Sequence, residues 1–127
     1  MEVKIMEKFK AMLETDKIVN HIDSLLGATT KVLQENHPNA IEIERNQKTE
    51  QTSGGYARIG TMIVTGTSYA DQLLVEISVG ISLVNGKPKQ TSHMTFAYRN
   101  NNEGAFRSYH EVSHEMKVAI AEAAKAN

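Results

Sequence analysis

An Asn-Gly pair at positions 85 and 86 constrains this chain more than any other feature, because alternating segments flank it on both sides. Asn and Gly tolerate the positive φ angles that a two-residue type I′ hairpin turn requires. Such a turn places Val84 opposite Lys87 and Gln72 opposite Arg99. In this register the large apolar side chains of both strands share one face: Leu73, Val75, Ile77, Met94, Phe96 and Tyr98. A shift of one residue would destroy this agreement, so the sequence predicts an antiparallel hairpin.

Close to the turn, the apolar face of the predicted hairpin has apolar side chains on the first strand only. Val79, Ile81 and Leu83 on the first strand would lie opposite polar residues and Pro88 on the second. Proline has no N–H to donate, which favours an edge position for the second strand. Two interpretations follow. Either a neighbouring strand or helix covers the apolar side of the tip, or the tip is an arm that docks on another subunit.

Two further segments complete a predicted four-stranded sheet. Residues 56–65 carry apolar side chains on both faces, which predicts a central strand. Ile41 and Ile43 alternate with glutamates and predict a short strand. Between these segments, residues 45–55 are polar and end in Gly-Gly, so we predict a flexible loop there.

Apolar residues at helical spacing mark both ends of the chain. In the first third these residues are Val3, Met6, Phe9, Leu13, Ile18, Ile22, Leu25, Leu26, Val32 and Leu33. Pro38 predicts that helical structure ends near Asn36, and the alanine-rich end of residues 105–125 predicts a final helix. The order of elements predicts an α+β domain, with a four-stranded antiparallel sheet and with the N-terminal helix or helices and the C-terminal helix packed on one face.

The composition narrows the classes of protein to which the chain can belong. Its 127 residues are expected to form one domain over 1–127. The chain has no cysteine, which excludes disulfides and thiolate sites and suits the reducing cytoplasm. The 14 basic residues are offset by 15 acidic ones, so bulk nucleic-acid binding is not expected. No membrane association is expected, because no apolar run approaches the ~20 residues of a membrane span.

The stretch His110-Glu111-Val112-Ser113-His114 has the spacing of a zinc peptidase motif. On a helix the two histidines can bind one Zn²⁺, and the glutamate can act as general base on a metal-bound water. No Gly-x-x-His follows, so a third ligand would have to come from His21, His37, His93 or an acidic residue upstream. The histidines point away from the apolar stripe of the predicted helix, which favours a solvated face and a chance match. A zinc site or a contact at an oligomer interface is the alternative.

The polar face of the predicted sheet carries the candidate ligand-binding residues. It is expected to hold His93 and Arg99, together with Arg58 if residues 56–65 pair alongside. Arg107 is placed at the start of the predicted last helix, where a helix N-terminus favours anions. Because arginine binds phosphate in a bidentate manner, these residues predict a site for a small anionic ligand. An ordinary solvated sheet face is the alternative.

These patterns predict a non-enzymatic binding domain without a cofactor, of the kind found among small bacterial or phage accessory proteins. We expect a homo-oligomer, assembled through sheet edges or terminal helices, that binds a protein partner or a small anionic, nucleotide-like ligand. The alternative is a minimal zinc-dependent hydrolase centred on His110, Glu111 and His114. A third interpretation, a nucleic-acid-associated protein that uses Arg58 and Arg99, predicts binding that falls steeply with added salt.

Overall fold

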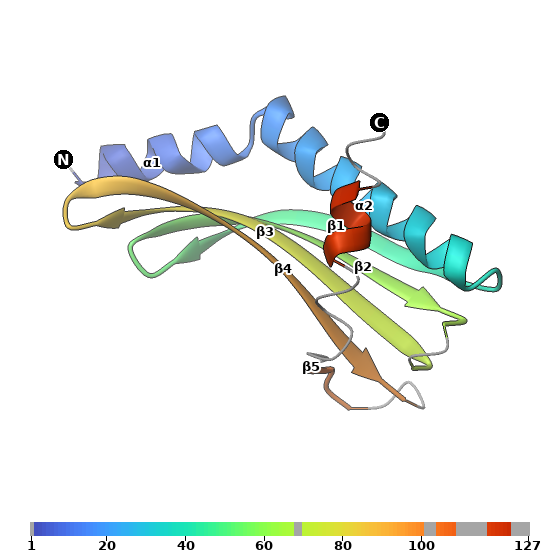
Figure 1. The fold of residues 1–127 in the computed structure, drawn as a ribbon. Helices are drawn as coiled ribbons and strands as arrows, with labels where there is room; N and C mark the ends of the chain where they lie inside the picture. Colours follow the sequence, from blue (N-terminus) through green and yellow to red (C-terminus); the bar gives the residue numbers. More distant parts are fainter. Residues whose placement is uncertain (1, 68–69, 101–103, 109–116, 123–127) are drawn as a thin grey trace.

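Two helices lie along one face of a curved antiparallel sheet, and none of the described helices lies on the other face (Figure 1). The computed structural model describes residues 2–67, 70–100, 104–108 and 117–122. The N-terminal helices are α1 (Glu2–Leu13) and α2 (Asp16–Asn36), and a C-terminal helix is described over 117–122. The strands are β1 (Ile41–Thr52), β2 (Gly55–Thr65), β3 (Gln72–Val84), β4 (Lys87–Arg99) and β5 (Arg107–Ser108).

The predicted α+β class is confirmed. The strands follow one another across the sheet in the order β1-β2-β3-β4-β5, and each neighbouring pair is antiparallel. The sheet has a fifth, two-residue strand in addition to the four that were predicted. The end of α2 at Asn36 also agrees with the stop expected before Pro38, and β2 lies between two other strands, as predicted.

The predicted register of the hairpin is confirmed over its whole length. Val84 pairs with Lys87 and Gln72 pairs with Arg99. Asn85 has a φ of 53° and Gly86 a φ of 77°, which are the positive values that a type I′ turn requires. The turn chemistry and the apolar pattern therefore select the same pairing.

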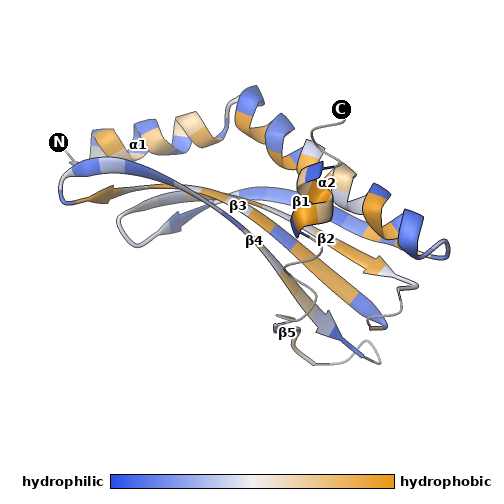
Figure 2. Ribbon diagram, in the orientation of Figure 1, coloured by the Kyte–Doolittle hydropathy of each residue, from blue (hydrophilic) through white to orange (hydrophobic). Residues whose placement is uncertain are grey.

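Helix α1 covers the apolar side of the hairpin near its tip. Phe9 and Leu13 of this helix belong to the same buried cluster as Val79 and Ile81 of β3. The prediction that a neighbouring element covers these side chains is therefore confirmed. Figure 2 shows hydrophobic residues along β3 and on the two helices that lie over the sheet. The strand opposite, β4, is exposed on both of its faces from Lys87 to His93.

The predicted loop at residues 45–55 was wrong, because most of this segment belongs to β1. The strand runs to Thr52 and pairs with β2 up to the turn at Ser53 and Gly54. An edge strand next to solvent can be stable without large apolar side chains when its backbone is paired and its polar side chains bond to their neighbours. In this strand Gln47 and Thr49 accept hydrogen bonds of 3.1 and 3.0 Å from Arg58 on β2.

The predicted helix at 105–125 was wrong at its start. Arg107 and Ser108 form β5 and pair with Tyr98 and Ala97 of β4. Pairing at a sheet edge outweighs the weak helix propensity of this segment. Helix is described from 117 to 122, and Ile120, which belongs to the predicted apolar stripe, is fully buried.

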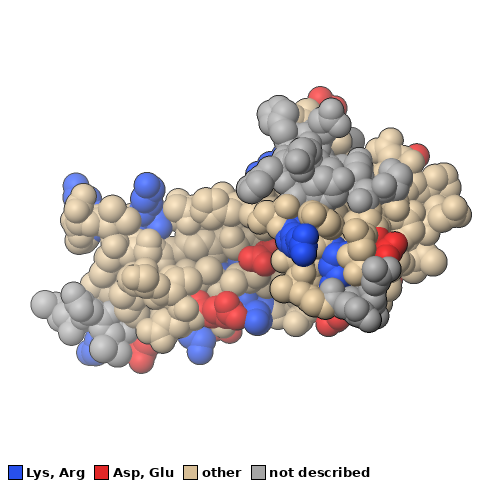
Figure 3. Space-filling view, turned by 90° about the horizontal axis from the view of Figure 1, so that it is seen from below, with Lys and Arg blue, Asp and Glu red and all other residues tan. Residues whose placement is uncertain are grey.

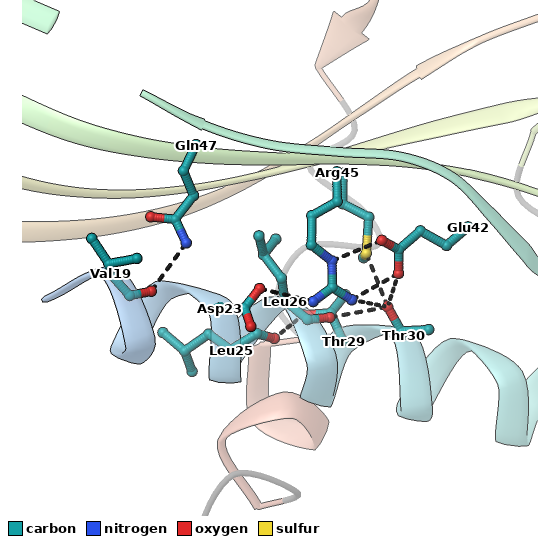
Figure 4. Close-up of polar contacts among 10 residues, drawn as sticks. Val19, Asp23, Leu25, Leu26, Thr29, Thr30, Glu42, Arg45 and Gln47 are labelled. Atoms are coloured by element: carbon teal, nitrogen blue, oxygen red, sulfur yellow. Dashed lines mark hydrogen bonds and ion pairs between the residues drawn. The ribbon is translucent and has the colours of Figure 1, made fainter. Parts of the chain in front are cut away.

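A β-bulge between Glu42 and Glu44 sets the contact between β1 and α2. In a regular strand the side chains of Glu42 and Arg45 would point to opposite faces, but the extra residue brings both to the helix side. Arg45 donates to both carboxylate oxygens of Glu42 at 2.7 Å and binds Asp23 of α2 at 3.0 Å (Figure 4). Thr30 of α2 donates to Glu42 at 2.9 Å. The bulge therefore builds a charged network that ties the edge strand to the helix.

Gly60 of β2 is expected to be intolerant of a side chain, because α2 lies directly over it. A Cβ atom on Gly60 would clash with Cγ2 of Ile22 and would lie 3.2 Å from Cδ1 of Leu26. We predict that Gly60→Ala lowers the free energy of unfolding by about 1–3 kcal/mol through overpacking. Urea denaturation measures this change.

Gly27 in the middle of α2 is the matched control, since no atom lies within 4 Å of a Cβ built there. Gly27→Ala is expected to raise the free energy of unfolding by about 0.5–1 kcal/mol, because alanine is the better helix former. Equal effects of the two substitutions would contradict the close packing at Gly60.

The charged network should make stability depend on pH. The hydrogen bond from Arg45 lowers the pKa of Glu42 below its ordinary value of 4.5. A carboxylate with a lowered folded-state pKa stabilises the fold above its unfolded-state pKa, and this stabilisation is lost as the pH falls through the folded-state pKa. Glu42→Gln is therefore expected to cost about 1–2 kcal/mol at pH 7 and much less at pH 2.5.

The measurement is the difference in unfolding free energy between the wild type and Glu42→Gln at both pH values. Glu50→Gln is the control, because Glu50 bonds at 2.6 Å to Lys48 in an exposed pair of low expected value. A Glu42→Gln difference that stays the same at both pH values would show that the carboxylate charge is not involved.

Candidate functional site

Two of the predicted ligand-binding residues share the uncovered face of the sheet but lie far apart on it. His93 and Arg99 are both on β4, and their partners on β3 are Ser78 and Gln72. At the rise of an antiparallel strand, the interval from 93 to 99 spans about 20 Å. One small ligand therefore cannot contact both residues.

Arg58 lies on the other face, so its predicted grouping with His93 and Arg99 was wrong. It pairs with Val79 of β3, whose side chain is buried beneath the helices. Its guanidinium group instead donates to Gln47 and Thr49 on the edge strand. Both faces of β2 are partly apolar, so only the register with β3 reveals which face the helices cover.

Arg99 does share a hollow with Arg107, the fourth predicted residue. The hollow has a volume of about 440 Å³ and lies where β4 ends and β5 begins. We call it the arginine hollow, and its described lining is Tyr98, Arg99, Asn100, Gly104, Ala105 and Arg107. Arg107 reaches it from β5 and not from a helix N-terminus as predicted.

Neighbouring groups hold the guanidinium group of Arg99 in one orientation. Its Nε donates to Oε1 of Gln72 at 2.8 Å, and its Nη1 donates to the carbonyl oxygen of Gly104 at 3.2 Å. The ring of Phe106 lies beneath it, with the guanidinium carbon 4.3 Å from the ring centroid. A cation held by hydrogen bonds and an aromatic face loses little conformational freedom when it binds a ligand.

The arginine hollow is electrostatically suited to an anion. Arg99 and Arg107 line it from two strands, and its described lining residues include no carboxylate. Guanidinium groups bind phosphate and carboxylate oxygens in a bidentate manner. Phe106 was not predicted as part of this site, because it fitted the apolar stripe of the predicted helix. The Asn-rich stretch before Gly104 was the available signal for a chain reversal.

Charges of both signs are scattered over the rest of the uncovered face. Figure 3 shows this face from below, with basic and acidic side chains, several of them next to each other, in a mostly uncharged surface. Lys48 and Glu50 of β1 neutralise each other at 2.6 Å. A local anion site fits this distribution better than a continuous basic surface does.

The His-Glu-x-x-His stretch lies outside the described residues. His110, Glu111 and His114 belong to residues 109–116, and the zinc alternative therefore stays a prediction. Among the residues that the structure describes, no three His, Cys, Asp or Glu side chains are grouped to hold a metal ion. Of the upstream histidines, His93 lines a groove together with Lys117 and Ile120, but its side chain belongs to the uncovered face, since it pairs with Ser78.

No protein-family model, curated protein or solved structure matches this chain. In the described part of the chain, no helix combines the length and the apolar character needed to cross a membrane.

Proposed function

We propose that this protein is a non-enzymatic binding domain that takes a small anionic, nucleotide-like ligand at the arginine hollow. The observation that carries the proposal is that Arg99 and Arg107, from two different strands, both line one hollow of about 440 Å³. Volumes of this size are typical of sites for small molecules. The described lining supplies cations and amides but no nucleophile beside a general base, which supports binding over catalysis.

The contacts of Arg99 support a ligand that carries phosphate groups. Gln72 and Gly104 fix the plane of its guanidinium group, and a fixed plane favours bidentate recognition. Arg107 is exposed and can adjust to the ligand. The lack of cysteine supports the cytoplasm as the place where the domain works.

Nucleoside diphosphate binding tests the proposal. We expect ADP to bind the wild-type chain and adenosine to bind much more weakly, because the guanidinium groups recognise the phosphates. Arg99→Gln combined with Arg107→Gln is expected to weaken ADP binding by about tenfold to a hundredfold, the loss typical of charged hydrogen bonds. Isothermal titration calorimetry at fixed salt measures both effects.

Lys17→Gln combined with Lys31→Gln provides a matched control, because it also removes two positive charges, both from exposed positions on α2. If this variant weakens ADP binding as much as the double arginine variant does, the effect is one of net charge. If ADP and adenosine bind alike, the proposed phosphate recognition is wrong.

We further propose that two copies of the chain assemble through the outer edge of β1. Among the described strands, β1 pairs only with β2, so its other edge is open. Ile41 and Ile43 lie on this edge strand with 63% and 57% of their surface exposed. Open edges and exposed apolar side chains are features that proteins usually cover with a partner. A second copy of this chain would pair with the open edge of β1 and cover the exposed isoleucines.

Ile41→Lys combined with Ile43→Lys is expected to shift the protein from dimer to monomer in light scattering coupled to size exclusion. Lysine on an edge strand opposes pairing through its charge. Val84→Lys is the control, since Val84 is 44% exposed at the tip of the other hairpin. A wild-type chain that is monomeric at 100 μM and above would contradict this assembly.

A further inference from the structure

A second hollow lies on the uncovered face, at the opposite end of β4 from the arginine hollow. It has a volume of about 260 Å³, and hydroxyl side chains from three strands and the β1–β2 turn line it. We call it the hydroxyl hollow. Its main lining residues are Ser53, Ser78, Gly80, Ser82, Thr91 and His93. Because about 20 Å of strand separate His93 from Arg99, the two hollows are separate sites.

The register of β3 and β4 explains why this part of the face is hollow. Ser78 pairs with His93 and Gly80 pairs with Thr91. Gly80 has no side chain, and its neighbour on β2 is the small residue Ala57. A Cβ atom on Gly80 would lie 3.1 Å from Oγ1 of Thr91. At Gly80 only the backbone separates the uncovered face from the core, so the surface is depressed there and forms the floor of the hollow.

Lys89 adds a positive charge beside this floor. It pairs with Ser82, so its side chain shares the face of Thr91 and His93 on the same strand. The lining itself includes no carboxylate among the described residues. Among the acidic residues on this side, Glu50 of β1 bonds to Lys48 at 2.6 Å, and Glu44 lies farther along β1. Glu76 of β3 lies beyond Ser78, at the end away from Lys89. One end of the hydroxyl hollow therefore favours negative charge.

The polar side chains of the hydroxyl hollow are available for a ligand. No side-chain hydrogen bond or ion pair joins Ser78, Thr91 or His93 to any other described residue. Hydroxyl groups both donate and accept hydrogen bonds, so they match a ligand that is itself rich in hydroxyls. The volume corresponds to about nine water molecules, which is more than a single phosphate ion needs.

We infer that the hydroxyl hollow binds the phosphate ester of a hydroxyl-rich molecule, such as a sugar phosphate. Lys89 and His93 on β4 receive the phosphate group, and Thr91 lies between them on the same face. Ser78 and Ser82 on β3 bond to hydroxyls of the ligand body, which rests on Gly80. This site differs from the arginine hollow in place and in chemistry, so it extends the proposed function and does not rest on it.

Glucose 6-phosphate, glucose and inorganic phosphate are the probes for this inference. In ¹H–¹⁵N NMR titrations of the full chain, we expect glucose 6-phosphate to shift the backbone signals of 78–82 and 89–93. We expect it to bind at least tenfold more tightly than glucose or phosphate alone, since each of these makes only part of the contacts. Glucose 6-phosphate that binds no more tightly than phosphate would overturn the inference.

Two variants and one control locate the binding. Gly80→Ala raises the floor and is accommodated by rotation of Thr91, and Lys89→Gln with His93→Gln removes the phosphate contacts. Each is expected to weaken glucose 6-phosphate binding by about tenfold or more. Lys87→Gln is the matched control, because Lys87 pairs with Val84 at the hairpin turn, outside the hollow, and should leave binding unchanged. Unchanged binding in both test variants would overturn the inference.

The double arginine variant separates this inference from the proposed function. With Arg99→Gln and Arg107→Gln, glucose 6-phosphate is expected to bind as it does to the wild type. If this variant abolishes the shifts, the sugar phosphate occupies the arginine hollow and the inference is wrong. If this variant loses ADP binding and keeps glucose 6-phosphate binding, the two ligands occupy separate hollows, as inferred.

Discussion

The burial of one face of β3 is the constraint on which the rest of the structure depends. Val75, Ile77 and Val79 are 0%, 1% and 1% exposed beneath the helices. Because side chains alternate along a strand, this burial commits Ser78 and Gly80 to the opposite face. The covered core and the uncovered polar surface are two results of one alternating pattern, which the Asn-Gly turn keeps in register on β4.

Segments with a strong local signal were predictable from the sequence. The hairpin combined a turn that needs positive φ with apolar pairs that a one-residue shift would destroy, so two independent requirements selected one pairing. Strand β1 offered neither signal. Its polar side chains indicated a loop. The strand is stabilised by pairing with β2 and by contacts such as that of Arg58 with Gln47, which the local sequence does not reveal.

The candidate site was predictable in its residue types but not in its grouping. Arg99 and its partner Gln72 followed from the hairpin register. Arg58 was assigned to the wrong face because β2 is partly apolar on both sides, and its orientation depends on pairing with Val79. Arg107 reached the arginine hollow by pairing with Tyr98 at a sheet edge, a contact between segments that local helix propensity cannot anticipate.

The bulge between Glu42 and Glu44 has a consequence for how related chains should be compared. Residues before the bulge and residues after it follow opposite parities with respect to the helix side of the sheet. A relative that lacks this one residue would have a regular strand there, and its Glu42 and Arg45 equivalents, now two positions apart, would still share the helix side of the sheet. A deletion at Ile43 therefore preserves the facing of the side chains in β1, whereas a deletion elsewhere in the strand would turn the residues beyond it to the other face. Strand β1 is best aligned as two blocks with a gap allowed between them.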